Sequence, residues 1–180
     1  MKKTALFIAF IVLFATLSSC SENKNTQPEY VPEFTLGETS DLGYENSFSG
    51  IGFKSRSLWK FEKPNQYEDP DVISDMKAVC GIDVVEVFYI NVEGTETTAR
   101  DYLKNSKKSL TDGWKHRKIY KKEFCGQQYA CFDSDYEYKK GEFHYMRRYA
   151  RKIGDHIVLI SIVTTSYTPG QIESMFYQLT

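Results

Sequence analysis

Apolar residues follow one another almost without interruption near the start of the chain. From Ala5 to Leu17 only Thr16 is polar, and two lysines precede this run. A basic start followed by so short an apolar run is typical of a secretory signal peptide, because a helix that crosses a membrane needs about 20 apolar residues. The pattern predicts that residues 1–19 are a signal segment.

The apolar run ends in Leu17-Ser18-Ser19-Cys20, which resembles the bacterial lipobox. In that motif an aliphatic residue and two small ones precede the cysteine that receives diacylglycerol. We expect cleavage before Cys20 and its acylation, which would anchor a lipoprotein in the bilayer of the cell envelope, facing outside the cytoplasm. Three acyl chains, at about 0.8 kcal/mol per buried methylene, make such anchoring permanent. The alternative is an ordinary secretory signal in which Cys20 is incidental.

The next segment is polar and shows no apolar periodicity. It contains Pro28 and Pro32 and no run of hydrophobic residues as far as Asp41. Such composition predicts a flexible tether over residues 20–43. Because no second linker or repeat follows, we expect residues 44–180 to form a single domain.

The alternation of apolar and polar residues, or the spacing of apolar residues by three and four positions, then predicts the strands and helices of that domain. Residues 44–53 read as two short strands joined at a bend that contains Gly50. Asp69-Pro70 resembles a helix start, and the apolar residues at 72, 73, 76 and 79 predict a helix of about ten residues. Residues 83–91 are rich in Val, Ile and aromatics and predict a buried strand. A second helix begins at a cap, Thr97 or Thr98, and ends at a glycine.

Four further strand patterns are separated by short turns, which describes an antiparallel meander. They are Lys115–Cys125, Gln128–Tyr138, Phe143–Ile153 and His156–Thr165. The last of them is apolar on both faces and is expected to be central and covered on both sides. Thr168-Pro169-Gly170-Gln171 matches a capping box, and apolar residues at 172, 175, 176 and 179 predict a docked C-terminal helix.

These elements predict an α+β fold, a mostly antiparallel sheet with helices on both faces. The run Tyr44-x-Asn46-x-Phe48-x-Gly50-Ile51-x-Phe53 with the subsequent order of elements resembles the PsbP-like α/β/α sandwich. The resemblance covers residues 44–180 and implies a binding or assembly module. It transfers no site residue, because its motif consists of structural residues.

Composition and charge exclude some classes of function. The 180 residues carry 23 basic and 24 acidic side chains and are 15% aromatic, which indicates a folded domain and argues against a nucleic-acid partner. The charges are uneven: residues 20–100 hold 15 acids and 7 bases, a net of −8, whereas residues 101–180 hold 9 acids and 14 bases, a net of +5. Such asymmetry either steers a partner or reflects lysine-rich solvent faces.

No residue set shows the spacing of a known catalytic motif. The three histidines, 116, 144 and 156, lie in expected strands, and the cysteines at 80, 125 and 131 lack zinc-site spacing. We therefore expect no enzyme, no cofactor and no metal. A turn with Gly126 at its first central position would place Cys125 and Cys131 about 10 Å apart on opposite faces, which predicts that they do not pair.

One strand combines aromatic and basic residues on one face. Tyr145, Arg147, Tyr149 and Arg151 alternate along it and are the candidate surface for an anionic partner. The alternative is a strand whose arginine stems and tyrosine rings cover one another.

The sequence thus favours a membrane-anchored, non-catalytic binding or assembly module with a protein partner. Two other readings remain open. One is a self-protection or inhibitor protein that blocks another protein. The other is a hydrolase or redox enzyme that uses Cys80, or a histidine that folding brings near a carboxylate.

Overall fold

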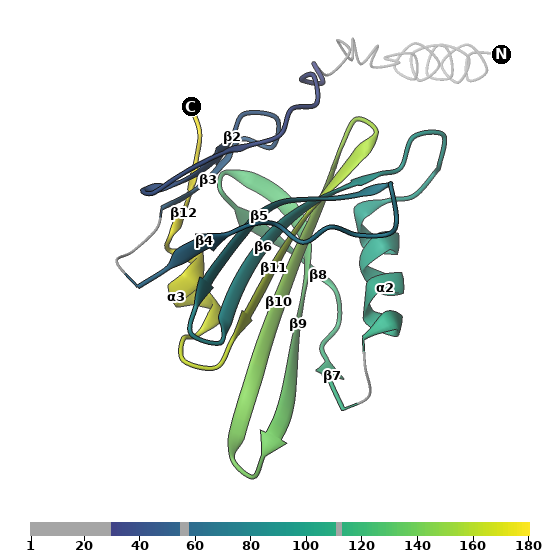
Figure 1. Ribbon diagram of the computed structural model, residues 1–180. Coiled ribbons are helices and arrows are strands. Elements are labelled where there is room, and N and C mark those ends of the chain that lie inside the picture. The colour runs from purple at the N-terminus through teal and green to yellow at the C-terminus, as the bar shows by residue number, and fades with distance from the viewer. Residues whose placement is uncertain (1–29, 55–57, 111–112) are drawn as a thin grey trace, which may run out of the picture. The chain divides into compact units, whose positions relative to one another are not determined.

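The computed structural model describes residues 30–54, 58–110 and 113–180. The predicted signal segment, Cys20 and the first part of the tether lie outside these residues. The compact unit begins at Val31, earlier than the boundary at residue 44 that the sequence suggested. Within the described residues it consists of two antiparallel sheets and two helices (Figure 1).

The larger sheet has the strand order β4-β5-β6-β11-β10-β9-β7, and β8 pairs with β9 beside this path. Its strands are β4 (Lys60–Glu62), β5 (Val72–Cys80), β6 (Asp83–Asn91), β7 (Lys115–His116), β8 (Tyr120–Phe124), β9 (Gln127–Lys139), β10 (Glu142–Ile153) and β11 (His156–Thr164). Neighbouring strands are antiparallel throughout. β11 lies in the middle and is buried from Ile157 to Ile162, as its apolar sequence predicted.

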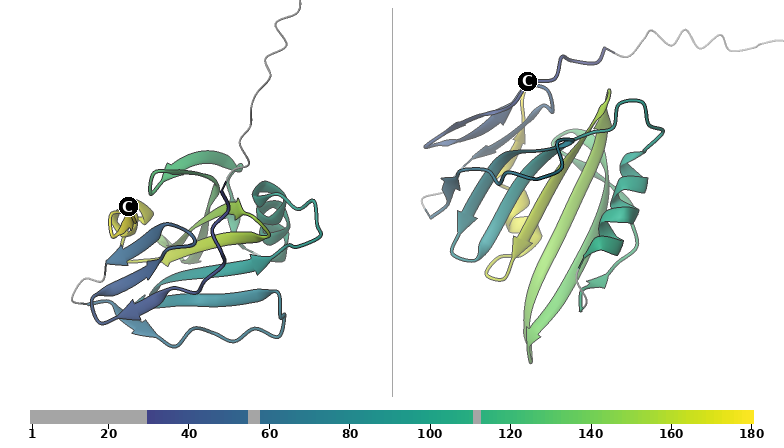
Figure 2. Two further views of the ribbon diagram at one scale, coloured as in Figure 1. Left: turned by 90° about the horizontal axis from the view of Figure 1, so that it is seen from above. Right: turned by 45° about the vertical axis from the view of Figure 1, so that its right-hand side comes forward.

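The smaller sheet has the order β1-β2-β3-β12. Its strands are β1 (Glu38–Ser40), β2 (Gly43–Asn46), β3 (Ile51–Lys54) and β12 (Phe176–Gln178). It covers one face of the larger sheet, together with α3 (Pro169–Glu173) (Figure 2). The shared core is aromatic: Phe53 packs edge-on against both Trp59 and Phe176.

The opposite face of the larger sheet carries α2 (Ala99–Ser109). Thr98 is its N-cap, and its hydroxyl accepts a hydrogen bond from the Asp101 amide at 3.1 Å. Leu103 is fully buried and packs with Phe132, Ile157 and other apolar residues of the sheet. The start of this helix was correctly predicted, but the helix ends at Ser109, before the glycine that was expected to end it.

The predicted helix at residues 70–79 is wrong, because this segment is strand β5. A bulge between Ser74 and Met76 shifts its register against β6. The bulge adds one residue to the strand, so Ile73 and Met76 face the same core although they are three positions apart. Three-residue spacing of this origin imitates the apolar face of a helix.

The C-terminal helix is shorter than predicted. Its capping box is present, with Thr168 as the cap and Gln171 as its partner, but the helix ends at Glu173. The amide of Lys54 then donates to the carbonyl of Met175, and Phe176 begins strand β12 beside β3. The apolar residues expected on one helix therefore divide between a short helix and a strand.

These two changes overturn the predicted fold class. The domain is β-rich rather than an α+β sandwich with helices on both faces. A four-stranded sheet provides most of the layer that helices were expected to form, and α3 is a five-residue element beside it. The antiparallel pairing of the central strands is confirmed.

The segment before β1 is part of the domain and not of the tether. The Phe34 ring stacks on His156 with centroids 4.0 Å apart and meets Phe48 and Tyr89 edge-on. The sequence did not reveal this contact, because a single aromatic residue among polar ones shows no periodicity.

Candidate functional site

The four residues of the predicted anionic-partner strand do not form one exposed surface. They all lie on the face of β10 that is turned toward the smaller sheet and α3. Tyr149 is fully buried, Arg147 and Arg151 are half-buried, and Tyr145 alone of the four is exposed, at 41%. Arg151 donates 2.8 Å hydrogen bonds to the Gln127 side chain and to a backbone carbonyl.

Arg147 belongs to an ion network that fastens α3 to the larger sheet. Its Nη1 donates to Glu173 and its Nε to Asp133, both at 2.5 Å. Glu173 also accepts from Lys122 Nζ at 2.7 Å and from the Tyr149 hydroxyl. Every charge in this group has an opposite partner, so the network has little capacity left for a ligand.

The same network sets the protonation of its members. Burial alone raises the pKa of Glu173, but hydrogen bonds from Lys122, Tyr149 and Arg147 outweigh burial and hold that pKa below its usual value.

Burial raises the pKa of the Cys131 and Cys125 thiols to about 11. Both cysteines are therefore protonated and poorly nucleophilic at neutral pH.

The β8–β9 turn differs from the predicted one. Cys125 and Gly126 are its central residues, with φ of 48° and 67°, which is the pattern of a type I′ turn. Cys131 consequently lies opposite Tyr120, which is not the pairing that a turn centred on Gly126 and Gln127 would give. The Tyr120 hydroxyl donates a 2.9 Å hydrogen bond to the Asp133 carboxylate, which lies diagonally across the strand pair. Cys80, Cys125 and Cys131 are free thiols.

A second buried polar cluster joins the two sheets. Asp75 lies in the β5 bulge and is 8% exposed. Its carboxylate accepts hydrogen bonds from the Tyr44 hydroxyl at 2.6 Å, from Asn46 at 3.1 Å and from the Gly37 amide at 2.9 Å. Burial, with Tyr89 and Asp75 nearby, raises the pKa of Tyr44 far above its usual range. The sequence did not reveal the cluster, because Asp75 was assigned to a helix.

A mostly basic surface lies where α2 meets the segment from β7 to β8. There the structure forms a groove of about 710 Å³, which we call the basic groove. Its lining includes five basic side chains: Arg100, Lys104, Lys107, Lys108 and Lys118. Among its described lining residues Asp101 is the acidic one, and that carboxylate is occupied by Lys104 at 2.7 Å and by the Thr98 hydroxyl.

Hydrogen bonds to the backbone hold two of these cations in place across the groove. Lys107 Nζ donates to the carbonyl of Arg117 at 2.8 Å, and Arg100 donates to the carbonyl of Ile119 at 3.4 Å. His116, also in the lining, shares a 2.6 Å hydrogen bond with Ser134. Burial, aided by neighbouring cations such as Lys107, lowers the pKa of His116. The positive charge of the groove near neutral pH is therefore that of its lysines and arginines.

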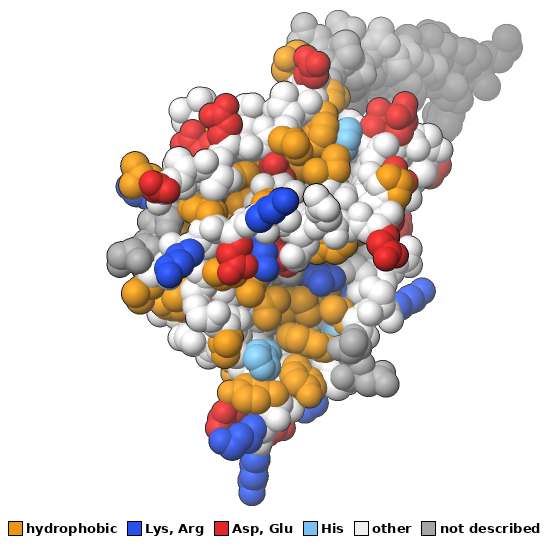
Figure 3. Space-filling view, viewed as in Figure 1, with side chains coloured by type: hydrophobic (Ala, Val, Ile, Leu, Met, Phe, Trp, Pro, Cys, Tyr) orange, Lys and Arg blue, Asp and Glu red, His pale blue; other side chains and the backbone are white. Residues whose placement is uncertain are grey.

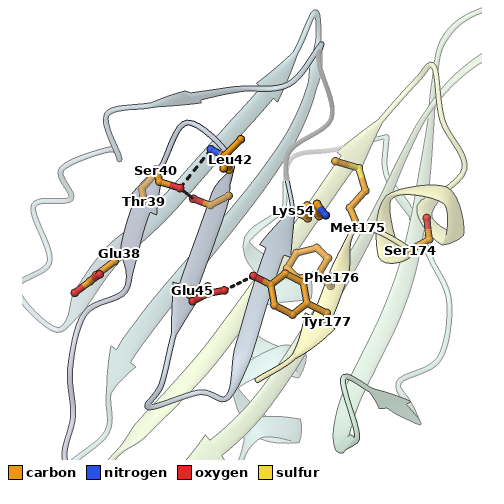
Figure 4. Close-up of a pocket in the computed structure, with 11 residues that line it drawn as sticks. Glu38, Thr39, Ser40, Leu42, Glu45, Lys54, Ser174, Met175, Phe176 and Tyr177 are labelled. Atoms are coloured by element: carbon orange, nitrogen blue, oxygen red, sulfur yellow. Dashed lines mark hydrogen bonds between the residues drawn. The ribbon is translucent and has the colours of Figure 1, made fainter. Parts of the chain in front are cut away.

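A second groove, also of about 710 Å³, lies on the smaller sheet (Figure 4). Apolar residues such as Phe176 line it beside Lys54, Glu38 and Glu45, and the Tyr177 hydroxyl donates to Glu45 at 2.5 Å. Since its charges are mixed and partly satisfied, the basic groove is the better candidate for recognition.

The described residues hold no group that suggests metal chemistry, since no three His, Cys, Asp or Glu side chains lie together. Folding places His156 on Phe34 and His144 between Tyr136 and Tyr138. Cys80 lies 3.9 Å from the Tyr167 hydroxyl. None of the described helices is long and apolar enough to cross a membrane.

The chain matches no protein-family model and no curated protein sequence. Among solved structures it is similar to the cyanobacterial PsbP (CyanoP) from Synechocystis, with 12% identity, a TM-score of 0.45, and coverage of 82% of this chain and 99% of the other. It is also similar to the Pseudomonas aeruginosa protein PA94, whose function is unknown, with 13% identity, a TM-score of 0.34, and coverage of 73% and 85%. Similarity at this level transfers no role to this chain.

Proposed function

We propose that this protein is a non-catalytic binding module of the cell envelope that holds an acidic segment of a partner protein in the basic groove. Acylated Cys20 anchors it to the membrane, outside the cytoplasm. The observation that carries the proposal is the set of five basic side chains around one groove with a single, already paired, carboxylate among its described lining residues.

Charge complementarity supports an acidic protein segment as the occupant. Exposed lysines bind an anionic surface through long-range attraction, which accelerates association and selects against basic partners. A groove that runs beside a helix and is lined by several cations suits an extended peptide with several carboxylates.

Charge reversal in the groove tests this proposal. We expect the variant with Lys104→Glu, Lys107→Glu and Lys108→Glu to bind a ten-residue poly-glutamate peptide at least about tenfold more weakly than the unmodified domain. The matched control reverses three exposed lysines elsewhere, Lys60, Lys63 and Lys140, and retains binding. Binding is measured by fluorescence anisotropy at low and high salt, and it should weaken as salt rises.

Crosslinking in native membranes identifies the partner. A partner that is lost in the groove variant, and that after purification competes with the acidic peptide, supports the proposal. Equal peptide binding by the groove variant and the control variant contradicts it. So does groove-dependent binding of anionic vesicles without peptide binding.

The membrane anchor has a separate test. Cells labelled with a fatty-acid analogue should yield labelled protein, and a Cys20→Ala variant should lose the label. Label that persists on that variant would exclude Cys20 as the acylation site.

A further inference from the structure

On the other side of α2 lies a smaller cleft between this helix and the sheet. It has a volume of about 380 Å³, within the range of pockets that bind small molecules. Its walls include Tyr67, Val72, Phe88, Tyr102 and Leu159. Figure 3 shows hydrophobic side chains gathered over the centre of the domain with basic side chains among them.

Arg148 contributes the charge of this cleft. It lies on β10 between Phe132 of β9 and Ser161 of β11, on the face that carries α2. Its Nη1 donates to the hydroxyl of Ser106. Its Nε is buried and has no hydrogen-bond partner among the described residues.

The surroundings of Arg148 do not neutralise it. Burial lowers its pKa, and the nearby groups Tyr102, Glu86 and Tyr67 only partly oppose that effect. Glu86 attracts Arg148 from a distance, and the Glu86 carboxylate accepts a hydrogen bond from Asn65 at 3.0 Å. Arg148 as a whole is half-buried, but its buried Nε lacks an acceptor, and this costs free energy in the unoccupied domain.

We propose that this cleft binds an amphipathic monocarboxylate, with the carboxylate on Arg148 and the apolar chain or ring against the aromatic and aliphatic walls. Arginine pairs with carboxylates through two parallel hydrogen bonds, and the apolar lining excludes water around that pair. Such a ligand supplies the counter-charge that the protein itself leaves out. This site is separate from the basic groove and does not depend on the function proposed for it.

Octanoate and 1-octanol test the proposal, because they share a chain and differ in the carboxylate. We expect octanoate to bind the unmodified domain and to shift amide NMR signals of α2 and β10. Arg148→Met should weaken octanoate binding about tenfold or more and leave 1-octanol binding nearly unchanged. Lys108→Met, which removes a charge from the basic groove instead, should leave the binding of both compounds unchanged.

A second variant keeps the test decisive if Arg148→Met does not fold. Ser109 is an exposed cleft residue, so Ser109→Trp should fill the cleft without disturbing the core and abolish binding of both compounds. The proposal is overturned if the unmodified domain shows no saturable octanoate binding. It is equally overturned if Arg148→Met or Ser109→Trp binds octanoate as well as the unmodified domain does.

Discussion

Two consecutive arginines on β10 have opposite surroundings. Arg147 faces the smaller sheet, where Asp133 and Glu173 each approach to 2.5 Å. Arg148 faces α2, where Ser106 is its hydrogen-bond partner and its Nε remains unsatisfied among the described residues. At these two positions, one arginine is compensated by two carboxylates, and the other has no carboxylate partner and a buried Nε without an acceptor among the described residues.

This difference separates a structural role from a binding role. A paired and half-buried ion network stabilises the native state only as a unit, because removal of one member leaves the others desolvated without a partner. A buried charge without acceptors lowers stability, and proteins tend to retain such features where a ligand completes them. Stability measurements on the two arginines can therefore test the assignment.

The largest effect is expected from Arg147→Met. Asp133 and Glu173 lose a shared cation in a region where their side chains are 21% and 15% exposed. We expect a loss of about 2–3 kcal/mol in the free energy of unfolding, somewhat below the value for a fully buried pair. Urea denaturation measures it. A loss below about 0.5 kcal/mol would mean that the network does not hold α3 in place.

A smaller effect, dependent on pH, is expected from Glu173→Gln. Because the folded-state pKa of Glu173 is lowered, its ionised form stabilises the protein above the unfolded pKa, and this contribution is lost as pH falls through the folded value. The unmodified domain should therefore lose stability between about pH 5 and pH 3 more steeply than the variant. Thermal melts across this range compare the two. Parallel curves would contradict the assignment.

Arg148→Met should have the opposite sign to Arg147→Met. Methionine fills a similar volume, and the variant no longer buries an unsatisfied Nε, so we expect stability to stay the same or to rise by about 1 kcal/mol. The same urea experiment applies. A loss comparable to that of Arg147→Met would show that Arg148 is a structural residue and would remove the contrast.

The smallest effect is expected from the triple reversal in the basic groove. Lys104 and Lys108 are exposed and Lys107 is half-buried. Reversing them should change the free energy of unfolding by no more than about 1 kcal/mol, since each exposed surface charge contributes little. A larger loss would indicate that the hydrogen bond from Lys107 to Arg117 is structural, and Lys104→Glu with Lys108→Glu would then replace the triple variant in binding studies.

The sequence by itself predicted the elements whose signals are local. The caps of α2 and α3, the strands β6, β9, β10 and β11, and the central place of β11 followed from capping residues and apolar runs. Such features depend on residues that are neighbours along the chain, so one sequence is enough to recognise them.

Tertiary structure decided what depends on pairing between distant segments. The bulge in β5 exists because the strand must pair with β6 while Asp75 meets Tyr44 of the smaller sheet. Phe176 continues as a strand because β3 offers a free edge. Neither partner is visible from the local sequence, and for this reason the fold class was predicted incorrectly.

The candidate sites divide in the same way. The sequence showed that basic residues are concentrated in the second half of the chain, and that β10 alternates aromatic and basic side chains. It did not show that Glu173, 26 residues after Arg147, neutralises that arginine. Nor did it show that α2 lies between a basic groove and the cleft at Arg148. Whether a charged side chain has a partner depends on which groups folding brings next to it, and those groups are distant in the sequence.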